Sequence, residues 1–352
     1  MRRTVLVGLT AGAMLLAACG NSTSTGEGAK QGEPINVGLI APLTGAYSAL
    51  GKGDREGAEV AVQQINAAGG IKGRKVNLIV KDDQTKPDQS VVAFDSLLSE
   101  GVVGVLGSSN SNAALAVAPL AQRQGIPYVS LSPSDELVQQ RLHNVVTVPP
   151  TSRMWSERDL QWMAAEGIKK IAVVYAQDDA FHSNGQRSTA DLAPKYGIEV
   201  VANESVETGA TDFSPALTHI RRSGAEAIFL WIAGPGAVIF TKQWAASDLH
   251  DDVKLVMTGA QASSLYSEPA GDAAEGVIIN GYAAVIGDHL PAGALKEKYQ
   301  TLSDELQRRY NSEFAQFTGD AHAGAELLFA AMEQASSLAP EAVADSLTVC
   351  RC

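Results

Sequence analysis

Two successive series of strand-like and helix-like segments constrain the fold of this 352-residue chain more than any other feature. The first series has short runs rich in β-branched residues, separated by longer amphipathic stretches, and the pattern restarts after Pro149 and Pro150. Strands that alternate with helices of ten or more residues form parallel sheets whose two faces are both covered. The pattern therefore predicts an α/β fold with two doubly wound lobes.

The predicted elements follow the two series in order. Strands of the first series are expected at 35–40, 75–81, 102–106 and 127–131, with helices at 52–67, 87–100 and 111–124. Strands of the second series are expected at 171–175, 198–204, 226–232, 254–258 and 276–280, with helices at 152–166, 185–196, 213–223 and 235–248. From about Tyr282 the chain is expected to be helical again, at 291–310, 321–337 and 340–346.

The N-terminal segment predicts an exported protein. Arg2 and Arg3 precede an apolar run, 5–18, that is too short to span a bilayer as a helix. The run ends in Leu-Ala-Ala-Cys, which resembles the bacterial lipobox. We therefore expect a lipoprotein signal peptide at 1–18 and a lipid on Cys19, with an ordinary signal peptide and a chance cysteine as the alternative. Residues 19–34 are polar and should form a flexible tether. The protein would then be lipid-anchored to the cell membrane on its outer or periplasmic face.

Charge and metal-ligand content exclude several classes of function. The net charge is −12, and removing Arg2 and Arg3 with the signal peptide leaves −14. Nucleic acid selects basic surfaces, so we expect no nucleic-acid partner. The histidines are dispersed, and Cys350 and Cys352 alone do not make an ordered zinc site. We expect no metal and no cofactor, and membrane contact through the N-terminal lipid only.

Polar loops at the ends of predicted strands are the candidate ligand site, because open parallel sheets bind ligands beyond the carboxyl ends of their strands. The loop Gly-Ser-Ser-Asn-Ser-Asn at 107–112 enters a helix through Asn110, Ser111 or Asn112. Backbone N–H groups and a hydroxyl at a helix N-terminus can bind a carboxylate, although a plain capped helix is the alternative. Ser132 and Ser134 follow the next strand at the same depth.

Apolar side chains of other strand-end loops complete the candidate site. Tyr47 and Leu50 follow the first strand and could cover a ligand, or could simply pack in a turn. In the second series, Phe181 and Trp231 could contact the ligand when the lobes close, although we favour a place in the core for Trp231. The chain has no Gly-x-Ser-x-Gly, Walker or Gly-x-Gly-x-x-Gly motif after a strand, so we expect that it is not an enzyme.

Four segments carry a resemblance to a known family. They read GLIAPLTG at 38–45, INAAGGIKG at 65–73 with Asp-Asp at 82–83, and TDFSPALTHI at 211–220, together with Ala-Pro at 118–119, Gly-Ile-Pro at 125–127 and Ser-Pro-Ser at 132–134. From about Ile35 to Ser346, the chain resembles the type I periplasmic binding proteins. The branched-chain amino acid (Leu/Ile/Val) receptors of ABC transporters are the most similar members.

The resemblance implies two lobes joined by a hinge, with the ligand trapped between them. It assigns 35–148 and 282–352 to lobe 1 and 149–281 to lobe 2. It implies that Ser111 binds the ligand's carboxylate, that Leu50 stands where the family often has a tyrosine, and that residues 132–134 form a second ligand loop. It also implies an ABC permease in the membrane as partner, and we expect a monomer.

Two departures from the family bear on the ligand and on the fold. Amino-acid binders usually place a glutamate after the strand at 254–258 to pair with the ammonium group, whereas here Gln261 is the nearest polar candidate. An unpaired buried ammonium is costly, so the ligand could lack an amine, unless Asp178 or Asp179 substitutes. The family also continues with further strands after 340–346, so we expect lobe 1 to be short at its C-terminus.

The sequence therefore predicts the extracytoplasmic solute-binding component of an ABC importer, which traps a small amino acid or a related carboxylate. The alternative is a ligand-sensing receptor subunit for a carboxylate without an amine, such as an aromatic or aliphatic acid.

Overall fold

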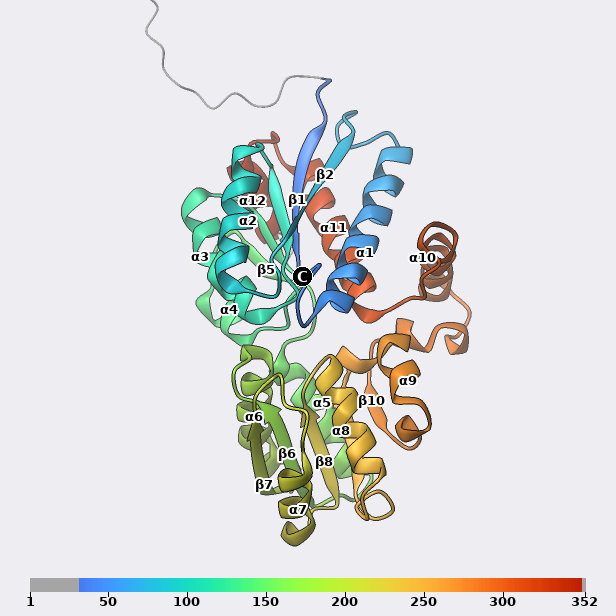
Figure 1. Ribbon diagram of the computed structural model, residues 1–352. Helices are drawn as coiled ribbons and strands as arrows, with labels where there is room; N and C mark the ends of the chain where they lie inside the picture. The colour runs from blue at the N-terminus through green and yellow to red at the C-terminus, as the bar shows by residue number, and fades with distance from the viewer. Residues whose placement is uncertain (1–31, 350–352) are drawn as a thin grey trace, which may run out of the picture.

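Two lobes, each built on a parallel sheet, make up the part of the chain that the computed structural model describes, residues 32–349 (Figure 1). The sheet of the first lobe has the strand order β2-β1-β3-β4-β5, and that of the second lobe has the order β10-β9-β8-β6-β7. All of the paired strands within these sheets are parallel. The predicted α/β class with two parallel-sheet lobes is confirmed.

The strands have the following bounds: β1 Ile35–Ala41, β2 Val76–Asp82, β3 Gly104–Gly107, β4 Tyr128–Ser130, β5 Val145–Thr147, β6 Lys170–Ala176, β7 Glu199–Val206, β8 Ala227–Trp231, β9 Lys254–Thr258 and β10 Ile278–Asn280. The α-helices have these bounds: α1 Ser48–Ala67, α2 Pro87–Ser99, α3 Ser111–Gln124, α4 Asp135–Gln140, α5 Ser152–Ala165, α6 Ala180–Leu192, α7 Ser214–Ser223, α8 Pro235–Ala245, α9 Ser264–Ala270, α10 Ala294–Tyr310, α11 Gln316–Gln334 and α12 Pro340–Val349. The 3-10 helices are η1 Ala193–Tyr196, η2 Gly259–Gln261, η3 Gly271–Ala274 and η4 Ala283–His289.

The first lobe buries both faces of its sheet, which explains why β1 reads as an almost continuous apolar run. Val37 and Leu39 pack with α1, α11 and α12 on one face, whereas Ile40 packs with α2 and α3 on the other. Because successive side chains of a strand point to opposite faces, a strand covered on both sides must be apolar at nearly every position.

The second lobe repeats this design with different helices. Ala172 and Val174 of β6 pack in a cluster with α7, α8 and α9, and Ile171 and Val173 pack in a cluster with α5 and α6. After β10 the chain returns to the first lobe, where α11 lies against α1 and α12 packs beyond it (Figure 1). The end of α11 that begins at Gln316 therefore lies at the level where the two lobes meet.

Several elements differ from their predicted bounds. The short elements β5, α4 and α9 were not predicted, because three to seven residues are too few to show a period. The helix predicted at 185–196 begins earlier, at Ala180, since Asp179 caps it. No helix within residues 32–349 is long and apolar enough to cross a membrane. The predicted signal peptide, the lipid site Cys19 and the C-terminal cysteines lie outside the described residues.

Candidate functional site

A cavity of about 40 Å³ lies between the two lobes, beyond the carboxyl ends of both sheets. The first lobe contributes the loops after β1, β3 and β4 and the start of α11. The second lobe contributes α5, the start of α6 and the loops after β8 and β9. The lining residues are Tyr47, Leu50, Ser109, Asn110, Ser111, Leu131, Pro133, Pro149, Trp155, Asp179, Phe181, His182, Ala233, Ala260, Gln316, Phe317 and Asp320.

The N-terminus of α3 supplies hydrogen-bond donors to this cavity. The loop before it turns at Gly107, whose φ of 105° and close approach to the Ile40 carbonyl leave no room for a Cβ. Asn110 then caps α3, its side-chain oxygen accepting from Ala113 N at 2.9 Å. Ser111 is 1% exposed, and its hydroxyl has no hydrogen-bond partner within the described residues. A buried hydroxyl at a helix N-terminus is suited to an anion.

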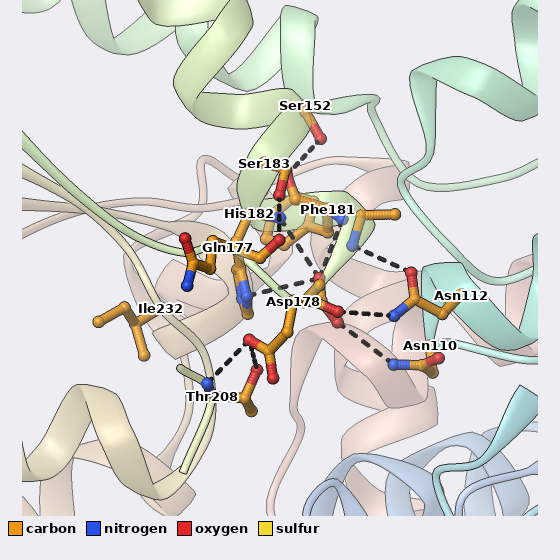
Figure 2. Close-up of polar contacts among 12 residues, drawn as sticks. Asn110, Asn112, Ser152, Gln177, Asp178, Phe181, His182, Ser183, Thr208 and Ile232 are labelled. Atoms are coloured by element: carbon orange, nitrogen blue, oxygen red, sulfur yellow. Dashed lines mark hydrogen bonds and ion pairs between the residues drawn. The ribbon is translucent and has the colours of Figure 1, made fainter. Parts of the chain in front are cut away.

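Hydrogen bonds join the two lobes beside the cavity (Figure 2). The Asn112 side chain donates to the Asp178 carbonyl oxygen at 3.1 Å and accepts from Ala180 N at 3.1 Å. The Asp179 carboxylate accepts from Asn110 Nδ2 at 3.4 Å and from the Tyr47 hydroxyl at 3.3 Å. Burial, reinforced by Asp179, holds the pKa of Tyr47 well above its usual range, so this hydroxyl keeps its proton and donates.

Asp179 is also the N-cap of α6. Its Oδ1 accepts from Phe181 N at 2.9 Å and from His182 N at 3.3 Å. The neighbouring Asp178 turns elsewhere, because its carboxylate accepts from Thr208 N and the Thr208 hydroxyl (Figure 2). A single carboxylate therefore holds the second lobe's helix and contacts two side chains of the first lobe.

Aromatic side chains form much of the remaining wall. Phe181 lines the cavity, and its ring meets that of Trp231 edge-on at a centroid distance of 5.2 Å. Trp231 lies behind it, outside the cavity wall, where its Nε1 donates to the Thr189 hydroxyl at 3.2 Å. Gly185 packs directly on the Trp231 ring, at a distance that would not admit a Cβ. Trp231 therefore supports the position of Phe181 from within the core.

In the loop after β4, the sequence neighbours of the predicted residues line the cavity in their place. Leu131 and Pro133 line the cavity, whereas Ser132 and Ser134 are buried beside it. Ser132 N donates to the Ser130 hydroxyl at 3.1 Å, and the Ser134 hydroxyl caps α4 by accepting from Leu137 N at 3.4 Å. In this structure the two serines shape the loop that carries the apolar wall.

Gln261 is likewise used inside the protein. Its Nε2 donates to the Ile232 carbonyl oxygen at 2.8 Å and so ties the loop after β9 to the loop after β8. Its neighbour Ala260 lines the cavity in its place. Of the predicted ligand residues, the structure thus brings Tyr47, Leu50, Ser111 and Phe181 to the cavity, and it places Asn112, Ser132, Ser134, Trp231 and Gln261 around it.

Polar residues that were not predicted complete the wall. His182 and Gln316 each have side-chain atoms without a hydrogen-bond partner within the described residues. Asp320 is 4% exposed, and burial holds its pKa well above the usual range. Behind the α3 loop, burial raises the pKa of Asp54 to about 8 against the opposing effect of Ser109. Among the lining residues of the described chain there is no Lys or Arg.

Comparisons with known proteins agree with this architecture. A family model described as periplasmic binding protein matches residues 34–349. The chain is 30% identical over 309 residues to Leu/Ile/Val-binding protein homolog 3 of Brucella melitensis, covering 86% of this chain and 80% of that protein. It is 27% identical over 316 residues to the Leu/Ile/Val-binding protein BraC3 of Rhizobium johnstonii, covering 89% and 83%.

Solved structures are similar in fold. The isoleucine complex of the branched-chain amino acid binding protein LivJ from Streptococcus pneumoniae has a TM-score of 0.78 at 21% identity, covering 89% of this chain and 87% of that one. A solute-binding protein from Rhodopseudomonas palustris in complex with 3,4-dihydroxybenzoic acid has a TM-score of 0.77 at 24% identity, covering 89% and 84%. The chain belongs to the periplasmic binding protein family.

Proposed function

We propose that this chain is the extracytoplasmic solute-binding component of an ABC importer, and that it traps a small amino acid or a related carboxylate between its lobes. The observation that carries the proposal is the buried hydroxyl of Ser111 at the N-terminus of α3, on the wall of the inter-lobe cavity, which has no hydrogen-bond partner in the described part of the chain. The ligand's carboxylate would accept hydrogen bonds from that hydroxyl and from the N–H groups of the first helical turn.

The relatives and the cavity wall both support the proposed ligand class. Relatives named for Leu, Ile and Val binding support an amino acid. Aromatic walls formed by Tyr47, Trp155 and Phe181 favour an apolar or aromatic ligand body, and a neighbour in fold holds 3,4-dihydroxybenzoic acid. An aromatic carboxylate sensed by a receptor subunit is therefore the second candidate. In either case the ligand is released unchanged, as expected of a carrier.

The route of export and the partners complete the proposal. A lipid on Cys19 would hold the protein at the membrane, and the tether 19–34 would let a monomer reach its permease. Replacing Cys19 by serine should move the protein from the membrane fraction to the soluble exported fraction. A Cys19→Ser variant that stays in the membrane fraction would contradict the lipid anchor.

Thermal unfolding of the purified chain with a panel of amino acids and amine-free carboxylates tests the ligand class. A ligand at a hundred times its Kd stabilises the protein by about 2.7 kcal/mol, which raises the Tm by several degrees. We expect a shift with at least one carboxylate of the panel. Product formation from any of these ligands, detected by mass spectrometry, would contradict a carrier function.

The variant Ser111→Ala tests the proposed contact. It should weaken carboxylate binding by about 1–3 kcal/mol, because the ligand loses a buried hydrogen-bond partner. The stability of the protein without ligand should stay the same, since the hydroxyl has no partner within the described chain. Unchanged affinity by calorimetry would place the carboxylate elsewhere.

A further inference from the structure

His182 is a buried histidine whose ring makes no hydrogen bond to any residue that the structure describes. It is the third residue of α6, its side chain is 1% exposed, and it lines the inter-lobe cavity. Neither Nδ1 nor Nε2 has a hydrogen-bond partner within the described residues. A buried polar nitrogen without a partner is unfavourable, so its presence on a cavity wall indicates that a ligand supplies the partner.

The charge state of the ring follows from its surroundings. Burial lowers the pKa of His182, and the nearby carboxylates of Asp179 and Asp178 only partly oppose that effect. The imidazole is therefore neutral at pH 7, with one N–H donor and one lone-pair acceptor. A neutral ring can bind a ligand through either nitrogen, depending on which one carries the proton.

The position of Asp179 decides which nitrogen carries the proton. Nδ1 of His182 lies 3.4 Å from Asp179 Oδ1, an oxygen that already accepts two backbone N–H groups. A lone pair on Nδ1 would face a carboxylate at that distance, so the proton belongs on Nδ1. Nε2 then presents a lone pair and needs a donor.

One other polar atom of the wall has the same requirement. Gln316 is 4% exposed, and its Oε1 is an acceptor without a partner within the described residues. Among the described residues, the wall carries no Lys or Arg side chain that could satisfy these two acceptors. None of the donors on the described part of the wall makes a hydrogen bond to Nε2 of His182. We therefore expect an N–H or O–H group of the ligand to supply it.

We propose that Nε2 of His182 accepts a hydrogen bond from the ligand and thereby selects carboxylates that carry an amine or a hydroxyl group over the same skeleton without it. The inference rests on the proposed function, because it presumes a carboxylate held at the N-terminus of α3. His182 is then a specificity-determining residue of the second lobe, whereas Ser111 binds the carboxylate group that all of these ligands share.

Two matched ligand pairs test the inference by isothermal titration calorimetry. L-Leucine and 4-methylpentanoate differ by the amine, and 4-hydroxybenzoate and benzoate differ by the hydroxyl. In at least one pair the donor-bearing member should bind the wild-type chain at least tenfold more tightly. The pair that shows this ratio distinguishes an amine from a hydroxyl as the donor.

The variant His182→Phe keeps a ring of similar shape and removes both nitrogens. It should reduce the ratio within that pair to less than about threefold by weakening the donor-bearing member alone. The variant His182→Gln retains an acceptor oxygen and should keep more of the ratio. Ser111→Ala is the matched control, and it should weaken both members equally and leave the ratio unchanged.

The outcomes separate this inference from the proposed function. A ratio that His182→Phe leaves unchanged, while carboxylates still bind, overturns the inference and leaves the proposed function standing. If circular dichroism shows that His182→Phe does not fold, the wild-type ratio decides, and a ratio near one in both pairs overturns the inference. Binding of no carboxylate in the panel overturns the proposed function and the inference with it.

Discussion

The N-termini of α3 and α6 both lie at the inter-lobe cavity, yet they are capped in different ways. α3 is capped by the neutral amide of Asn110, whereas α6 is capped by the carboxylate of Asp179. A helix N-terminus carries about half a positive charge, which a carboxylate cap neutralises and an amide cap leaves in place. Of these two helix ends, the α3 end therefore remains available to an anionic ligand. The α6 end places His182 and Phe181 at the cavity.

The largest effect should come from breaking the α3 loop at Gly107. Gly107→Ala places a Cβ against the Ile40 carbonyl oxygen at a φ of 105°, so we expect a loss of at least about 3 kcal/mol in the free energy of unfolding. Gly167→Ala is the control, because Gly167 also has a positive φ but open space around it, and it should cost only about 1 kcal/mol. Urea denaturation measures both. Equal losses would show that the loop has room to adjust.

A smaller effect should follow from removing the α6 cap. Asp179→Ala leaves two backbone N–H groups without a cap and removes the acceptor of Tyr47 and Asn110, so the protein should lose about 2 kcal/mol of stability. Asp179→Asn keeps a good capping oxygen and should lose less than half as much. If the two variants lose the same amount in urea, then the charge of Asp179, and not its capping bonds, is the stabilising feature.

Exchanging the caps tests the comparison directly. Asn110→Asp can still cap α3 but adds a negative charge beside Ser111, so carboxylate ligands should bind at least tenfold more weakly, or about 1.4 kcal/mol. The double variant Asn110→Asp with Asp179→Asn restores one donor and one acceptor across the lobes. Its free energy of unfolding should return to the wild-type value, whereas its affinity for carboxylates should stay low. Recovery of full affinity in the double variant would disprove the role of the neutral cap.

A pH-dependent effect concerns Asp54, behind the α3 loop. Burial raises its pKa to about 8 from an ordinary value of 3.8, so the folded protein holds a proton there that the unfolded chain releases. The contribution of protonated Asp54 to the free energy of unfolding is therefore fully present below about pH 4. It is lost as the pH rises to about 8, by about 1.4 kcal/mol per pH unit between these values. Asp54→Asn should remove that part of the slope. An unchanged slope in denaturation at pH 5, 6 and 7 would contradict the raised pKa.

The fold was predictable because its main signal is local. Alternating β-branched and amphipathic segments identify parallel sheets, and the ends of parallel strands lie at one edge, so the loops with Tyr47, Ser111 and Phe181 could be found from strand ends. The elements that were missed, such as β5 at 145–147, are too short to carry a period. Their place depends on packing against neighbours.

The rest of the site was not predictable for a geometric reason. Gln316 and Asp320 reach the cavity because α11 packs against α1, more than two hundred residues earlier in the chain, and no strand-end rule includes a helix that returns from the other lobe. The loop after β4 shows a finer limit. A shift of one residue exchanges Ser132 for Leu131 and Pro133 at the wall, and only the turn geometry determines that register.

The bonds that Asp179 and Asn112 make between the lobes have a consequence for selectivity. They join protein to protein, so they stabilise the contact between the lobes by the same amount whichever solute lies inside. A contribution that is equal for all ligands raises every affinity together and distinguishes none of them. The discrimination between solutes therefore depends on the few cavity atoms that the lobes do not satisfy for each other.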